Sequence, residues 1–161
     1  MLPLACGGDG YGGGPTDPGN GDTDIRGSYT AIHEFTLSIG TIGDSFECPG
    51  SLTITILNNG QFTGQISVEA TSDESCEDAS TPFSGTVSSS GAVEVPVTPE
   101  DIEALSAIFA ELGCVIVSSD EAFTGTFNGT VITVSFSADL ECEGIAGDVT
   151  FTYGIEATRI S

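Results

Sequence analysis

The side chains best suited to chemistry in this sequence are one histidine and two tyrosines. His33 lies in a run of alternating apolar and polar residues, which places it on the inward face of a strand together with Tyr29. Tyr153 holds a similar inward place in the last apolar run. A catalytic histidine needs a nucleophile and an orienting acid, and the sequence contains no G-x-S-x-G elbow. We therefore predict no catalytic residue. In a hollow interior the ligand contacts would be His33, Tyr29, Tyr153 and Phe35.

A cluster of acids surrounds Cys76: Asp73, Glu74, Glu77 and Asp78. Carboxylates this close repel one another unless water or a cation screens them, so calcium is a candidate ligand. A solvated acidic loop explains the same residues and is the preferred interpretation. Paired carboxylates for glycoside hydrolysis require two acids across a cleft, and no pair stands out. We predict no cofactor, with calcium as the alternative.

The cysteines predict two disulfide bonds. Cys48 with Cys76 and Cys114 with Cys142 are separated by equal stretches of sequence, which leaves Cys6 without a partner. No CxxC motif is present and one histidine cannot complete a zinc finger, so metal ligation is not expected. Spaced, even-numbered cysteines are typical of an oxidising compartment.

The charge excludes several classes of function. The 161 residues include 24 acidic and two basic residues and no lysine, and the net charge is -22. Such a chain repels phosphate backbones, so we expect no nucleic-acid partner. The absence of lysine also excludes a P-loop and a lysine Schiff base. The length suits one domain with a tail.

Period-two alternation predicts strands over residues 28–39 and 148–160 and in three hairpins between them. Asn128-Gly129 favours a two-residue type I′ turn that sets Phe127 opposite Thr130. A three-residue loop over residues 58–60 keeps apolar faces together by pairing Ile56 with Phe62. A similar loop over residues 89–91 pairs Val87 with Val93. Three strands carry a Phe-x-Gly sequence, ending at Gly64, Gly85 and Gly125, which indicates sharp curvature or close approach.

One helix is expected after Thr98, which can cap it, with Pro99 at its first position. Its apolar stripe is Ile102, Leu105, Ile108, Phe109 and Leu112, and Gly113 ends it. Residues 114–127 form one long bulged strand or a short strand plus a turn. We prefer the first option, because it sets Cys114 opposite Cys142 and lets the last strand pair with the first. We predict an all-β fold, an antiparallel up-and-down barrel or half-open barrel of about eight strands with one helix, with a β-sandwich as the alternative.

The start of the chain, Leu4-Ala5-Cys6 followed by a glycine-rich tract, resembles the lipobox and tether of bacterial lipoproteins. In that family the cysteine becomes the N-terminus and carries the lipid. With the hairpin order, the whole resembles small lipocalin-like lipoproteins of the bacterial cell envelope. The resemblance implies export, a lipid anchor on Cys6 in the outer membrane or at the cell surface, and three regions: a lipobox remnant (1–6), a flexible tether (7–26) and a barrel (27–161).

We therefore expect a non-enzymatic, lipid-anchored structural or interaction domain, at the surface or in the periplasm. The seven inward phenylalanines are numerous enough to fill an eight-stranded barrel: Phe35, Phe62, Phe83, Phe123, Phe127, Phe136 and Phe151. The alternative is a carrier of a small apolar ligand in the barrel, and a weaker alternative is a hydrolase with a carboxylate pair. The oligomeric state stays open.

Overall fold

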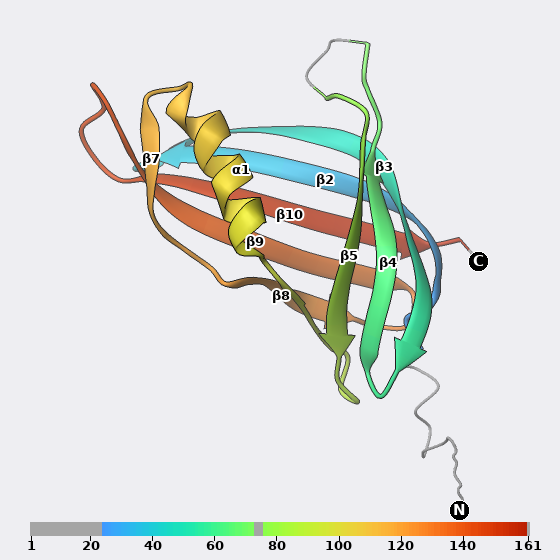
Figure 1. Cartoon of the computed structure of the whole chain (residues 1–161). Helices are drawn as coiled ribbons and strands as arrows, with labels where there is room; N and C mark the ends of the chain where they lie inside the picture. Colours follow the sequence, from blue (N-terminus) through green and yellow to red (C-terminus); the bar gives the residue numbers. More distant parts are fainter. Residues whose placement is uncertain (1–23, 73–75, 161) are drawn as a thin grey trace, which may run out of the picture.

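The computed structural model describes residues 24–72 and 76–160, which form a barrel with one helix (Figure 1). The elements are β2 (Gly27–Ile39), β3 (Ile42–Asn58), β4 (Gln61–Val68), β5 (Ala79–Val87), β6 (Ala92–Pro96), α1 (Pro99–Ala110), β7 (Cys114–Ser119), β8 (Ala122–Phe127), β9 (Val131–Cys142) and β10 (Val149–Arg159).

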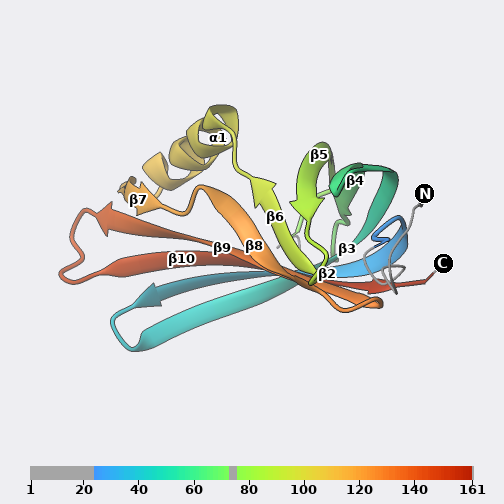
Figure 2. The same cartoon turned by 90° about the horizontal axis from the view of Figure 1, so that it is seen from below.

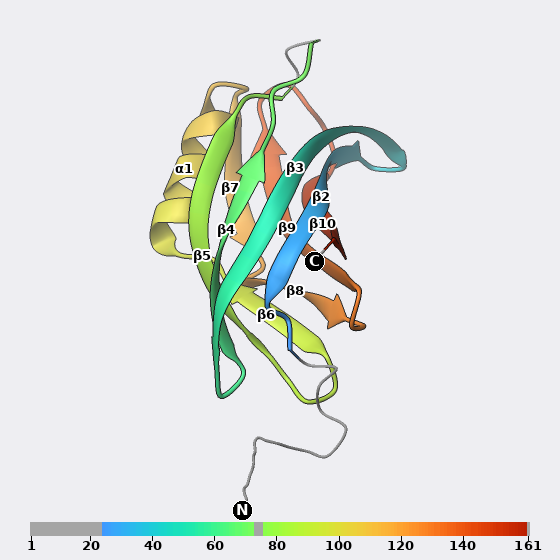
Figure 3. The ribbon, with the colours of Figure 1, turned by 90° about the vertical axis from the view of Figure 1, so that its right-hand side faces the viewer.

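The sheet closes on itself because β10 pairs with β2 along one edge and with β9 along the other. All pairings are antiparallel, and β7 and β8 both lie along β9, so the ring has eight positions. Figure 3 shows β2 to β5 following one another around the wall. The predicted all-β barrel is confirmed, and the sandwich alternative is wrong, because one continuous sheet makes the whole wall.

The stretch from 114 to 127 is broken in the middle. Cys114 lies opposite Cys142 as predicted, but residues 120–123 face only residues 136–137, so two extra residues bulge out. Asp120 bridges the break: its backbone N–H donates to the Ser137 carbonyl, and its carboxylate accepts from the Ser137 N–H, both at 2.9 Å. The stretch therefore combines both predicted options. It forms two strands, β7 and β8, but they share one position in the barrel beside β9.

Two hairpin registers differ from prediction. At residues 128–131 the loop has four residues and Phe127 pairs with Ile132, because the Asn128 carboxamide oxygen accepts from the N–H groups of Thr130 and Val131. The two-residue type I′ turn predicted there is wrong. The shift is by two residues, so the same side chains still face inward.

The type I′ geometry lies instead at Asn59 and Gly60, with φ angles of 55° and 79°. Ile56 therefore pairs with Thr63, so the predicted three-residue loop is wrong. A bulge between Ile54 and Ile56 restores the predicted pairing of Ile54 with Gly64. The predicted pair Val87 and Val93 is confirmed.

The buried side chains form two clusters, one at each end of the interior. The first gathers around Tyr29, Phe62 and Phe127 and includes Ile25. The second lies under α1, where Phe109 packs against Phe151, and it includes Phe136. Figure 2 shows the helix over the part of β9 and β10 that extends beyond β4 to β6.

The helix begins as predicted, with a capping box in which Thr98 and Asp101 each accept the other's backbone N–H. Its predicted apolar stripe is only partly buried. Phe109 is 5% exposed, but Ile108 is 55% exposed and Leu112 is 65% exposed, because the helix contacts the sheet along a narrow line. Ile108 of the predicted stripe therefore faces solvent, and Leu112 lies beyond the end of the helix.

Glycines let neighbouring strands accept bulky partners. Phe62 lies opposite Gly85 and Phe83 lies opposite Gly64 across the pair β4–β5, and the two rings meet edge to face at 5.9 Å. A Cβ at Gly64 or Gly85 would lie within about 3 Å of the facing ring. The predicted close approach is confirmed, and it curves the wall at this point.

Gly125 gives a direct test of this packing. A Cβ there would collide with the backbone of Thr133 and Val134 in β9. We expect Gly125→Ala to lower the free energy of unfolding by about 2 kcal/mol or more, as overpacking does. The matched control is Gly154→Ala in β10, where the nearest atom is 4.0 Å away, and urea unfolding of both variants is the measurement. Equal stability of the two variants would contradict this account.

Candidate functional site

A cavity of about 990 Å³ opens into the barrel, and residues of both buried clusters form part of its walls. Its walls come from most of the strands and are largely apolar: Leu52, Ile54, Phe62, Ile66, Phe83, Val93, Val95, Phe123, Ile132, Val134, Phe136 and Ile155. Leu105 of α1 adds to one side. The phenylalanines of the central strands therefore line the space rather than fill it.

The mouth of the cavity lies between β5 and α1. Among the lining residues, Thr81 shares the inward face with its partner Ile66 yet is exposed, and Asp101 and Ala104 on the helix are exposed too. The strands explain the opening. β5 and β6 pair at only two positions, and β6 then follows β8 toward the helix.

One charged residue, Asp101, lines the cavity among the described residues. Its Oδ2 accepts from the Thr98 N–H at 3.0 Å as part of the capping box. The other polar residues of the lining, such as Thr81, are uncharged. Tyr153 on β10 is also neutral, and its hydroxyl is already bonded to His33. An apolar space with few polar groups is typical of a site for a small ligand.

His33 is a hydrogen-bonded core residue. It is fully buried, its Nε2 lies 2.9 Å from the Ser67 carbonyl and its Nδ1 lies 2.7 Å from the Tyr153 hydroxyl. The carbonyl can only accept, so Nε2 carries the proton and Nδ1 accepts from Tyr153. Burial lowers the pKa of His33, opposed by its bond to Ser67, and burial raises the pKa of Tyr153. Neither ring nitrogen is free for catalysis.

The four predicted ligand contacts are placed differently. Tyr153 lines the cavity, whereas His33, Tyr29 and Phe35 lie outside its lining. The Tyr29 hydroxyl donates to the Ile25 carbonyl at 2.6 Å in the first cluster. Phe35 stacks on Phe46 at 5.1 Å and packs beside the Tyr153 ring at 4.4 Å in the second cluster. The strand alternation predicted that these side chains face inward. It did not predict which of them lie beside the cavity and which lie in the buried clusters.

Arg159, which the sequence analysis did not single out, closes the end of the barrel opposite the helix. It donates to the carbonyls of Asp24 at 2.6 Å and Arg26 at 3.0 Å, and to the Tyr29 hydroxyl at 3.0 Å. Its guanidinium lies 5.2 Å from the ring centre of Phe127, a cation–π distance. We call this the closed end. Ile25, placed in the tether by sequence, is fully buried here, so the packed chain begins earlier than residue 27.

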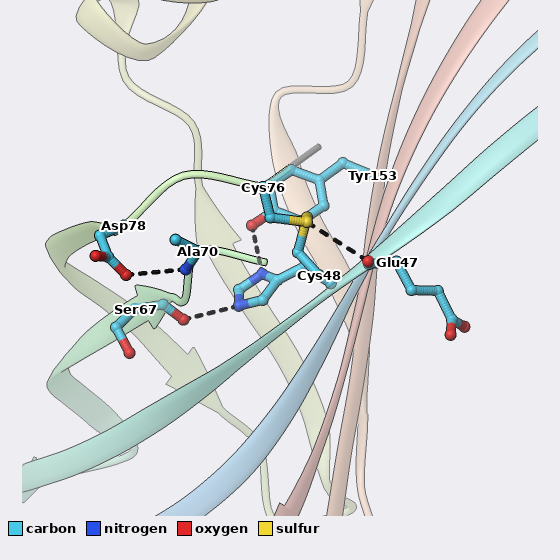
Figure 4. The surroundings of a disulfide bond; sticks show 8 residues. Glu47, Cys48, Ser67, Ala70, Cys76, Asp78 and Tyr153 are labelled. Carbon is cyan, nitrogen blue, oxygen red and sulfur yellow. Dashed lines mark hydrogen bonds between the residues drawn. A yellow bond between two sulfur atoms is a disulfide. The ribbon is translucent and has the colours of Figure 1, made fainter. Parts of the chain in front are cut away.

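Both predicted disulfides are confirmed, Cys48–Cys76 and Cys114–Cys142. The first ties the loop after β4 to β3 (Figure 4). Cys48 lies opposite His33 of the neighbouring strand β2. The second joins β7 to β9 across directly opposed positions. Cys6 lies outside the described residues, so its lipidation stays a prediction.

The predicted calcium loop is described only in part. Asp73 and Glu74 lie outside the described residues, whereas Glu77 and Asp78 are exposed and Asp78 accepts from the Ala70 N–H at 2.9 Å. Within residues 24–72 and 76–160 no group of three or more His, Cys, Asp or Glu side chains could hold a metal ion. Calcium binding at the whole loop stays a prediction.

Comparison with known proteins gives no family. No family model matches the chain, and no curated protein matches it. Among solved structures, a redesigned β barrel is 11% identical with a TM-score of 0.42, over 88% of this chain and 96% of that one. Rv2717c from M. tuberculosis is 14% identical with a TM-score of 0.40, over 85% of this chain and 93% of that one. Similarities this distant carry no argument about function.

In the described part of the chain, the one helix is too short and too polar to cross a membrane.

The buried histidine predicts a pH dependence of stability. Because its folded pKa is lowered, the unfolded chain binds a proton near pH 6.5 while the folded chain does not, so stability falls as the pH drops below that value. At pH 5.5 the loss relative to pH 7.5 is at most about 1.4 kcal/mol, the value for a His33 that stays neutral throughout in the folded chain. His33 is the only histidine, so His33→Gln should remove this component. Urea unfolding of both proteins across this range is the measurement, and parallel pH profiles would contradict a neutral, buried His33.

Proposed function

We propose that this protein is a non-enzymatic, lipid-anchored protein of the cell envelope whose barrel binds one small apolar molecule. The observation that carries the proposal is the apolar cavity of about 990 Å³ that opens between β5 and α1. Ligand sites in proteins are concave, mostly apolar and roughly 300–1,000 Å³ in volume. A cavity at the upper end of that range suits an extended chain or a multi-ring molecule.

The cavity favours the carrier over the structural module that the sequence suggested first. That choice depended on phenylalanines filling the interior. Phe62, Phe83, Phe123 and Phe136 instead stand around the cavity, while Phe127 packs at the closed end. Water against such walls is unfavourable, so a bound apolar molecule would release it.

The lining supports a binding role rather than catalysis. Among its described residues Asp101 is the one carboxylate, and none is a histidine, cysteine or lysine. A carboxylate pair for glycoside hydrolysis would need a second acid facing the same space. The weaker hydrolase alternative therefore gains no support from this site.

One feature supports the envelope location, and a second is compatible with a lipid anchor. The two disulfides suit an oxidising compartment. The described chain enters at the closed end, where Arg159 holds the carbonyls of Asp24 and Arg26. An anchor on Cys6 would therefore join the barrel at the closed end and leave the mouth accessible.

A filled cavity should no longer bind ligand. Val95 of β6 lines the cavity and is half-buried, so Val95→Trp places a large ring inside it. We expect the neutral apolar dye N-phenyl-1-naphthylamine to fluoresce strongly with the natural protein and to bind the variant at least tenfold more weakly, because the ring occupies the volume that the dye needs.

The matched control for this experiment is Val117→Trp on β7, which is 55% exposed and does not line the cavity. Thermal unfolding of both variants shows whether they are folded. No dye binding by the natural protein, or equal binding by both variants, would contradict the carrier and favour the structural module.

The lipid anchor has a separate test. When it is expressed in the organism it comes from with an alkyne-tagged fatty acid, the natural protein should be labelled and found with the membrane fraction. Cys6→Ser should lose both properties, because the thiol that carries the lipid is gone. A labelled serine variant, or an unlabelled natural protein, would contradict the anchor without bearing on the cavity.

A further inference from the structure

The cavity has no cation with which to bind an acid. None of its described lining residues is lysine, arginine or histidine. Arg26 is exposed and paired with Asp24 at 2.7 Å, and Arg159 is held by backbone carbonyls and the Tyr29 hydroxyl at the closed end. His33 has both nitrogens engaged. A carboxylate brought inside the barrel would therefore lose its water without gaining an opposite charge.

The helix N-terminus beside the mouth does not supply an anion site either. Pro99 has no N–H, the Thr98 N–H is bonded to Asp101, and the Asp101 N–H is bonded to the Thr98 hydroxyl. The capping box thus occupies the N–H groups of Thr98 and Asp101, and of the first-turn donors only the Glu100 N–H stays outside it. Glu100 adds another negative charge in the same turn.

Asp101 makes the mouth negative. Its Oδ2 is used within the capping box, and its Oδ1 has no hydrogen-bond partner among the described residues. It is exposed and borders the cavity, so the head group of a ligand with its tail inside would lie beside it. The whole chain, with a net charge of -22, adds long-range repulsion for anions.

We infer that the cavity selects neutral and cationic amphiphiles over fatty acids, with Asp101 as the counter-charge for a cationic head group. The inference rests on the proposed carrier function and names the class of ligand for that site. An anion is disfavoured in either orientation, because its head meets apolar walls inside or Asp101 outside. An alcohol carries no charge in either position, and an ammonium group gains an ion pair at the mouth.

The test uses three ligands with the same tail at pH 7.5 and low salt. Dodecanol, dodecylammonium and dodecanoate each compete, below their micelle concentrations, with bound N-phenyl-1-naphthylamine. We expect dodecanol and dodecylammonium to displace the dye at concentrations at least tenfold lower than dodecanoate. Asp101→Asn should weaken dodecylammonium roughly two- to fivefold, as expected for an exposed ion pair, and leave dodecanol unchanged.

The control variant is Glu100→Gln, which removes the same charge from the neighbouring residue but does not border the cavity. Displacement by dodecanoate at the same concentration as dodecanol overturns the inference while the carrier function stands. Equal effects of the two variants on dodecylammonium overturn the role of Asp101. Absence of dye binding overturns the carrier function itself, so the two failures are distinguishable.

Discussion

The structure depends on the pairing of β10 along both of its edges. As the last strand, it pairs with β2 on one side and with β9 on the other, which closes the sheet into a ring. Its inward row passes through every part of the interior. Phe151 contacts Phe109 under the helix, Tyr153 borders the cavity and Arg159 fills the closed end. The register of this one strand therefore positions both buried clusters and the cavity.

The cavity exists because the ring is continuous but unevenly paired. β5 follows β4 along its length but meets β6 at only two positions. Pro96, which cannot donate to a strand partner, ends β6, and the Thr98 capping box then starts a helix. At the wide end of the sheet the interior is covered by this helix and not by a further strand. Its first turn becomes the side of the mouth, so the same residues that begin the helix also set the charge there.

The sequence predicted the closed sheet, the helix start and both disulfides, since alternation, capping and cysteine spacing are local signals. It predicted the loop over residues 89–91 but not the other two hairpin turns, because Asn128 bonds to two backbone groups through its side chain and a bulge corrects the register at Ile56. The cavity could not be predicted, since its volume depends on the separation of strands distant in sequence. Arg159 had a signal that was missed: it continues the inward row after Ala157, which is unusual for a charged residue.

Two different forces would act on a ligand of the proposed carrier, and they have different ranges. The apolar walls act through contact, at about 25 cal/mol per Å² of apolar surface removed from water, and salt changes this little. The charge of -22 acts through solvent and is screened beyond about 8 Å at physiological ionic strength. Asp101 lies within that range of any head group at the mouth. In a saline environment the distant acids would therefore lose their influence first, and the sign of the preferred head group would depend on this single residue.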